Sequence, residues 1–166
     1  MTKFQWPLSG VFGPPLGSHD NASLDIVKQM LQGKVPACPR LQFGVVDVRD
    51  VAALHLAAMT SPSAAGQRYI ATTEQTVWLS EFGKILQAGL KADYPQYAKK
   101  VPTKELSDWL VKGLANVIPM LRGMTELGWK KNFSSQKARS ELGWSTRSNE
   151  ETVLSAARAL IEQGDV

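Results

Sequence analysis

The sequence predicts an α/β or α+β domain that has a small sheet and several helices. Segments of strand character alternate with segments of helical periodicity early in the chain, and helical patterns dominate later. The clearest strand is the valine-rich run at residues 43–48, which has the composition of a buried strand. A chain of 166 residues, 43% of them hydrophobic and 20% charged, is long enough to bury one core without disulfides.

The first element is a short strand at Val11 and Phe12, which ends in a glycine-proline turn over residues 13–17. A helix follows, with Ser23 as its N-cap, because apolar residues then recur at helical spacing until Gly33. The residues between this helix and the valine-rich strand contain two prolines, so they are expected to be extended.

Asp50 is the expected N-cap of a second helix over residues 51–59, which ends before a Ser-Pro pair. Residues 67–71 predict another strand. The rest of the chain predicts four helices, because each has an apolar stripe, a capping residue or both. They cover residues 80–90, residues 103–118 with Thr103 as cap, residues 134–142 with Ser134 as cap, and residues 148–163 with a capping box from Ser148 to Glu151.

Composition excludes several classes of function. The net charge is only +4 and the two signs are interspersed, so we expect no nucleic-acid partner. The longest mostly apolar stretch, residues 51–59, is far shorter than the roughly 20 residues of a membrane span. No secretory signal is recognisable at the N-terminus, and a single cysteine, Cys38, fits a reducing cytosol. We therefore expect a cytoplasmic protein with no membrane partner.

Searches for catalytic motifs fail. The two histidines and Cys38 are not at metal-ligand spacing, so no metal site is expected, and His55 and Cys38 are interpreted as structural or solvated. No glycine pair has the G-x-G spacing of a dinucleotide loop, and there is no Walker or G-x-S-x-G sequence. None of the three tyrosines is followed by lysine four residues later. We assign no catalytic residue to this chain.

Four segments in order nevertheless resemble one family. They are Val-Phe-Gly-Pro-Pro-Leu at residues 11–16, Val-Val-Asp-Val-Arg-Asp-Val-Ala at residues 45–52, Gly-Gln-Arg-Tyr-Ile-Ala at residues 66–71, and Lys-Ala-Arg-Ser-Glu-Leu-Gly-Trp at residues 137–144. Together they resemble the C-terminal, substrate-binding half of extended short-chain dehydrogenases/reductases, in the branch of dihydroflavonol-reductase-like aldehyde and ketone reductases. The resemblance covers residues 11–166, and residues 1–10 depart from the family pattern as an irregular N-terminus.

The resemblance implies a Rossmann-type parent enzyme whose other half binds NAD or NADP and carries a Ser, Tyr, Lys set. There the tyrosine donates a proton to the carbonyl while the nicotinamide delivers hydride. This chain contains neither the cofactor loop nor the Tyr-x-x-x-Lys pair. We therefore expect a truncated or split product that is inactive alone and binds no cofactor stably by itself. A separate chain carrying the Rossmann half is a candidate partner, beside a small carbonyl substrate.

Three site residues can be carried over from the resemblance. Val11 would present its backbone to the nicotinamide carboxamide. Ser23 would stand at a helix N-terminus that faces the cofactor diphosphate, where an anion is stabilised by free amides and the helix dipole. Gly10 occupies a position that lines the substrate pocket in related reductases, although glycine has no side chain to form that wall.

Two alternatives remain open at this point. The parent could be a sugar-nucleotide epimerase or dehydratase of the same superfamily, since those enzymes share two of the motifs. The chain could also be a non-catalytic binding or interaction protein, or a remnant. Under the preferred reading, loss of the Rossmann half uncovers apolar surface on the Val11 strand and on the helix after Ser23. We then expect a helical core with a loosely held N-terminal third.

Overall fold

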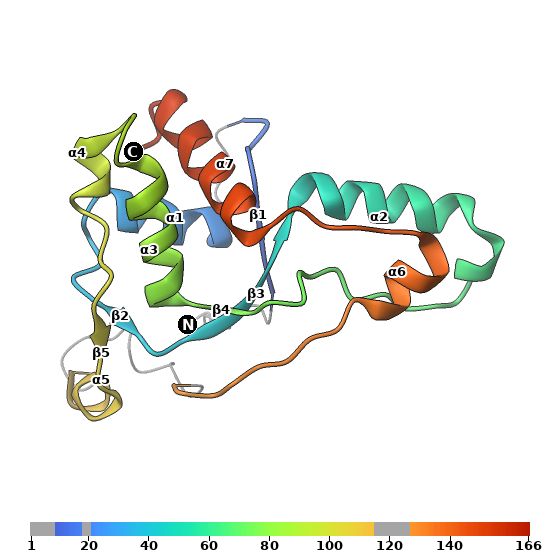
Figure 1. Cartoon of the computed structure of the whole chain (residues 1–166), viewed down its shortest axis with the longest axis horizontal. Helices are drawn as coiled ribbons and strands as arrows, with labels where there is room; N and C mark the ends of the chain where they lie inside the picture. The colour runs from blue at the N-terminus through green and yellow to red at the C-terminus, as the bar shows by residue number, and fades with distance from the viewer. Residues whose placement is uncertain (1–8, 18–20, 115–126) are drawn as a thin grey trace, which may run out of the picture.

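The computed structural model describes residues 9–17, 21–114 and 127–166, which form small parallel and mixed sheets surrounded by helices (Figure 1). The described elements, in chain order, are β1 (Ser9–Phe12), α1 (Ala22–Leu31), β2 (Cys38–Pro39), β3 (Gln42–Asp47), α2 (Val48–Thr60), the 3-10 turn η1 (Pro62–Ala64), β4 (Val77–Trp78), α3 (Leu79–Leu90), α4 (Pro95–Ala98), β5 (Glu105–Leu106), α5 (Asp108–Leu114), α6 (Gln136–Leu142) and α7 (Asn149–Glu162).

The main sheet has the strand order β1-β3-β4. β1 and β3 are parallel, with Val11 opposite Val46, whereas β3 and β4 are antiparallel. β1 therefore lies at one edge of this sheet. A separate two-stranded parallel ladder joins β2 to β5. The predicted α/β class with a small sheet is confirmed.

The larger core lies between the main sheet and helices α1, α3 and α7. Three aromatic rings mark its centre: Phe82 of α3 lies 5.2 Å from Phe12 and 5.7 Å from Phe43, centroid to centroid. Phe12 and Val45 both face this core, because residues two apart on a strand share a face and paired residues of neighbouring strands do too. α1 contributes five buried side chains, so it is anchored in the core.

A smaller cluster lies on the other face of the sheet. It joins Val46 of β3 to Leu54 of α2, Ala138 of α6 and Trp144. Figure 1 shows α2 extending to one side of the molecule with α6 beside it, away from the other described helices. None of the described helices is both long enough and apolar enough to cross a membrane.

Several predicted boundaries are wrong, and each error has a local cause. α1 starts at Ala22 and is capped by Asn21, whose side chain accepts a hydrogen bond from the Ser23 backbone, so Ser23 lies inside the helix. α2 is likewise capped by Asp47 and not by Asp50. In both cases the side chain of an earlier Asn or Asp accepts a hydrogen bond from the backbone N–H two residues later. Each helix therefore begins up to one turn before the predicted start.

Two other predicted elements also differ. Residues 67–71 form no strand in the described structure; they run irregularly, and Tyr69 and Ala71 contact the smaller cluster. The helix predicted from Thr103 begins only at Asp108, because Leu106 is taken up by β5. Its last predicted residues, 115–118, lie outside the described residues. The final helix is confirmed, with Ser148 as its cap.

Candidate functional site

The candidate site is the edge of the sheet where the parallel strands β1 and β3 both end. In open α/β sheets, ligands bind outside the carboxyl ends of the parallel strands. β1 continues into the Gly13-Pro14-Pro15 turn, and β3 ends at Asp47. Gly13 has a φ of +116°, and a Cβ there would lie 3.0 Å from Asp47 Oδ1. Glycine thus lets the two strand ends come into direct contact.

Asp47 anchors this edge through its neighbour Arg49. The Asp47 side chain is fully buried, and its Oδ1 accepts hydrogen bonds from the Arg49 backbone N at 2.9 Å and from Nε at 2.8 Å. Its Oδ2 accepts a third from Nη2 at 2.7 Å. Burial alone would raise the pKa of Asp47, but the hydrogen bonds and charge of Arg49 outweigh it and hold the pKa below its ordinary value. Asp47 is therefore a charged structural anchor, not a proton donor.

A second acidic residue extends the anchor toward α7. Asp50 is almost fully buried, its Oδ2 accepts a hydrogen bond from the Arg147 backbone N at 2.7 Å, and its Oδ1 pairs with the Arg147 guanidinium. The backbone carbonyl of Asp50 accepts a hydrogen bond from Trp144 Nε1 at 2.8 Å. Arg147 also pairs with Glu151 at 3.1 Å. These contacts fix the start of α2 against the segment that joins α6 to α7.

Helix α7 borders the same edge along its length. Arg49 Nη2 lies 3.3 Å from Ser155 Oγ and 3.8 Å from Glu151. Near the other end of α7, Gln163 Nε2 donates a hydrogen bond to the Pro15 carbonyl at 3.1 Å. The turn after β1 is thus tied to the last helix of the chain, which gives the candidate site a fixed border.

The three site residues predicted from the resemblance lie on β1 and α1. Val11 is 36% exposed and lies on the edge strand β1. Ser23 is half-buried in the first turn of α1, and its amide already donates to Asn21 Oδ1 at 2.9 Å. Gly10 is buried, and a Cβ there would lie 2.4 Å from the Phe12 ring. That side of Gly10 is therefore filled by Phe12 of the larger core. The ligand roles of all three stay predictions.

The tyrosines do not form a proton-donating pair with lysine. Tyr69 OH donates a hydrogen bond to Glu141 at 2.8 Å, and this bond, with burial and the Glu141 charge, raises the pKa of Tyr69. Lys137 lies over the Tyr69 ring at 5.1 Å, where it makes a cation-π contact, and donates to Gln67. A catalytic tyrosine needs the opposite shift, toward a lower pKa.

His55 and the acidic groups also give no catalytic or metal constellation. His55 is exposed, and its Nδ1 lies 2.8 Å from the Val51 carbonyl, one turn earlier in α2. Over residues 9–17, 21–114 and 127–166, no three His, Cys, Asp or Glu side chains cluster as metal ligands would.

Cys38 is buried in β2, and its Sγ donates to the Pro102 carbonyl at 3.3 Å. Burial and, secondly, the Glu105 charge raise the pKa of Cys38 to about 11. We predict that the native thiol reacts with a disulfide reagent such as DTNB at pH 8 about 100-fold more slowly than the thiol of the urea-unfolded chain. Rapid stoichiometric labelling of the native protein, measured by the absorbance of the released thiolate, would contradict this assignment.

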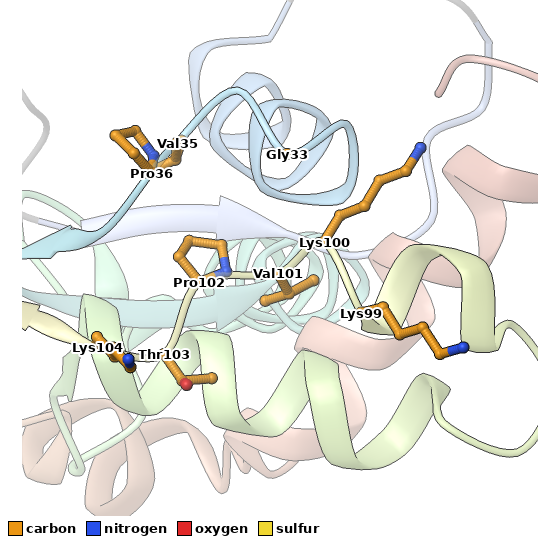
Figure 2. Close-up of a pocket in the computed structure, with 9 residues that line it drawn as sticks. All are labelled: Gly33, Val35, Pro36, Lys99, Lys100, Val101, Pro102, Thr103 and Lys104. Carbon is orange, nitrogen blue, oxygen red and sulfur yellow. The ribbon is translucent and has the colours of Figure 1, made fainter.

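A shallow groove of about 380 Å³ lies elsewhere, between the end of α1 and the segment that follows α4. Its lining includes Gly33 and the residues from Lys99 to Lys104 (Figure 2). The lysine side chains there point in different directions, and the Lys100 stem packs on Gly33, at the C-terminus of α1. The helix dipole stabilises a positive charge at the C-terminus of α1, so the position of Lys100 is explained without a ligand.

Sequence reasoning missed Asp47 and Arg147. Asp47 carried a usable signal, because an Asp two residues before an Arg at the end of a strand can cap the next helix and pair with that arginine. Arg147 carried none, because its partner Asp50 is 97 positions away in the sequence.

Comparison with known proteins gives matches to reductases. No protein-family model matches the sequence. The chain is 29% identical over 161 residues to the ketoreductase azaE of Aspergillus niger, which covers 92% of this chain and 41% of that protein. It is 43% identical over 94 residues to cinnamoyl-CoA reductase 2 of Arabidopsis thaliana, which covers 57% of this chain and 26% of that protein. The chain thus spans less than half the length of the curated relatives it matches.

Solved structures give the same fold. Yeast methylglyoxal/isovaleraldehyde reductase Gre2, solved with NADPH, superposes with a TM-score of 0.65 at 23% identity over 95% of this chain and 46% of its own. The terminal R domain of the myxalamid PKS-NRPS pathway also has a TM-score of 0.65, at 14% identity over 95% of this chain and 43% of its own. These structures show that the chain has the fold of part of a Rossmann-type reductase, and its sequence relatives are named as reductases, in agreement with the resemblance that its motifs carry.

Proposed function

We propose that this chain is the substrate-binding portion of an NAD(P)H-dependent reductase that acts on a small aldehyde or ketone. The observation that carries the proposal is the sequence match to a ketoreductase over 92% of the chain, supported by the stronger identity to a cinnamoyl-CoA reductase over 57%. Hydride transfer then requires a nucleotide-binding part that supplies the cofactor loop and the Tyr-Lys pair. Neither motif is present in these 166 residues.

In this proposal, the residues at the carboxyl ends of β1 and β3 orient the ligand. Val11, which is exposed on β1, presents its backbone to the nicotinamide, and the first turn of α1 faces the cofactor diphosphate. Asn21 already accepts the Ser23 amide, so Ser23 contributes to anion binding through its hydroxyl and the helix dipole. The Asp47–Arg49 pair fixes the end of β3 to the start of α2, and Gly13 lets the turn after β1 approach Asp47.

The alternative parent, a sugar-nucleotide epimerase or dehydratase, has weaker support. The structure of the Bordetella bronchiseptica enzyme WbmG with NAD and UDP has a TM-score of 0.61, but its sequence identity is 12%. The curated relatives that match are named as reductases. A non-catalytic role of the chain as a binding protein is the other candidate, and the activity test below separates it from the reductase proposal.

The first test uses the purified 166-residue chain. We predict no aldehyde-dependent loss of NADPH absorbance at 340 nm and no saturable quenching of NADPH fluorescence, because the proton donor and the phosphate loop are not in this sequence. The azaE ketoreductase serves as the positive control. Steady oxidation of NADPH by the chain alone, dependent on an added aldehyde or ketone, would show that the requirement for a second part is wrong.

A further inference from the structure

The groove between the end of α1 and the segment that follows α4 combines apolar and positively charged side chains. Its volume is about 380 Å³, and its lining contains three lysines but no carboxylate. The apolar residues of the lining are Val35, Pro36, Val101 and Pro102. Val101 is buried and Val35 is half-buried, so the apolar part is firmly attached to the larger core. We refer to this site as the lysine groove.

Two lysines of the groove, Lys99 and Lys104, carry charges that are not neutralised by a neighbour. Both are exposed, and neither forms an ion pair with a carboxylate in residues 9–17, 21–114 and 127–166. Glu105 follows Lys104 in the sequence, but its Oε1 accepts a hydrogen bond from Ser80 Oγ of α3 at 2.6 Å. The lysine groove therefore presents positive charge for which the described part of the chain provides no partner.

The arrangement of the lysines favours an extended ligand. Figure 2 shows Lys99 and Lys104 near opposite ends of one stretch of backbone, pointing away from each other, so a single small anion cannot contact both. Five residues of chain separate them by at most about 18 Å. A strand rises about 3.3 Å per residue, so an extended peptide of about five residues has the same reach. Lys100, between them, is engaged by the Tyr97 ring, 5.6 Å from its Nζ.

The lining favours a peptide over a nucleic acid. Proteins that bind single-stranded nucleic acids stack the bases on aromatic side chains, and the lining of the lysine groove contains none. Val101 and Pro102 lie instead between the two charged lysines in the sequence, where an apolar side chain of a peptide can be buried. A segment with carboxylates on either side of an apolar residue is thus complementary to the groove in both charge and hydrophobicity.

We propose that the lysine groove binds an extended acidic segment of a partner protein. Carboxylates of that segment contact Lys99 and Lys104, and an apolar side chain between them packs on Val101 and Pro102. The groove lies apart from the carboxyl ends of β1 and β3, so this interaction does not depend on the proposed function.

The test measures binding of a fluorescein-labelled, nine-residue peptide to the purified 166-residue chain by fluorescence anisotropy at low salt. Every fourth residue of the peptide is glutamate, valine lies midway between the glutamates, and serine fills the other positions. The groove variant is Lys99→Glu/Lys104→Glu. The matched control is Arg68→Glu/Lys130→Glu, which makes the same change in net charge at two exposed residues outside the groove.

Saturable binding to the wild-type chain is expected, weakened at least about tenfold in the groove variant and less than about threefold in the control. A peptide with glutamine in place of glutamate should not bind. Circular dichroism checks that each variant is folded, and the milder Lys99→Gln/Lys104→Gln should weaken binding by about threefold to fivefold.

Three results would overturn the proposal. One is the absence of saturable binding to the wild-type chain, and another is equal weakening by the groove and control variants, which would show attraction by net charge alone. The third uses a labelled nine-nucleotide oligothymidine: tighter binding than the peptide, lost in the groove variant, would assign the groove to nucleic acid. None of these measurements uses reductase activity, so their failure is distinguishable from failure of the proposed function.

Discussion

Replacing Phe12 by alanine is expected to lower the free energy of unfolding by about 3–5 kcal/mol, the usual cost of removing a buried aromatic side chain. Phe12 is 2% exposed, and its ring contacts Phe82 and Phe43 at the centre of the larger core. The same ring closes the space over Gly10. Urea unfolding followed by tryptophan fluorescence measures the change, and a loss below about 1 kcal/mol would contradict the position given to this ring.

Gly10 provides the matched control for this prediction. In the wild-type chain, Gly10→Ala places a Cβ 2.4 Å from the Phe12 ring, so the substitution should be destabilising. In the Phe12→Ala background the ring is gone, and Gly10→Ala should be tolerated. The two substitutions are therefore expected to be strongly non-additive. Additive effects would mean that the Phe12 ring does not lie over Gly10, which would leave space for a substrate beside residue 10.

Replacing Asp47 by alanine is expected to cost about 2–3 kcal/mol, because the N-cap of α2 and the hydrogen bonds from Arg49 are lost together. Arg49 is partly exposed and can be solvated when its partner is removed, which keeps the cost below that of an orphaned buried charge. For a chain of this length, the melting temperature should fall by about 5–10 °C. The isosteric Asp47→Asn retains part of the cap and should cost less.

The effect of Asp47 should also depend on pH in a defined direction. Its pKa is lower in the folded chain than its ordinary value, so its ionised form stabilises the fold. That contribution is fully present above the unfolded pKa of about 4 and is lost as the pH falls through the lower folded pKa. The stability difference between wild type and Asp47→Asn is therefore expected to be constant from pH 5 to pH 7 and to shrink below about pH 4. A difference that grows on acidification would contradict the assignment.

The fold class and several helices could be predicted because their signals are local. The valine-rich strand and the Ser148 cap each depend on residues that are neighbours in sequence. The sequence predicts Ser23 and Asp50 as helix caps, two or three residues after the true caps Asn21 and Asp47. All four residues are good capping residues, and local propensity cannot rank them. Residues 67–71 have strand composition, but they run irregularly, and Tyr69 and Ala71 pack on the smaller cluster instead.

The expectation that the helix after Ser23 exposes apolar surface is wrong, while the loosely held N-terminal third stays a prediction. Val27, Met30 and Leu31 are fully buried against α3, α7 and the sheet, so this helix is part of the larger core. The uncovered apolar face lies on α2 instead, while the exposure predicted for Val11 is confirmed. Periodicity indicates that a helix has an apolar face, but which neighbour covers that face depends on contacts distant in sequence. Likewise, the site residues Gly10, Val11 and Ser23 were placed only by resemblance.

The role of this chain as a substrate-binding portion is tested most directly by a chimera in which the chain replaces the matching segment of the azaE ketoreductase, assayed for its substrate profile. If the chain is the substrate-binding portion of a carbonyl reductase, the chimera should oxidise NADPH with small aldehydes or ketones, and its ranking of kcat/KM across a substrate panel should differ from that of azaE itself. The chain alone should show no turnover on the same panel. A soluble chimera that binds NADPH but reduces no carbonyl compound, or one that keeps the azaE ranking unchanged, would contradict the claim.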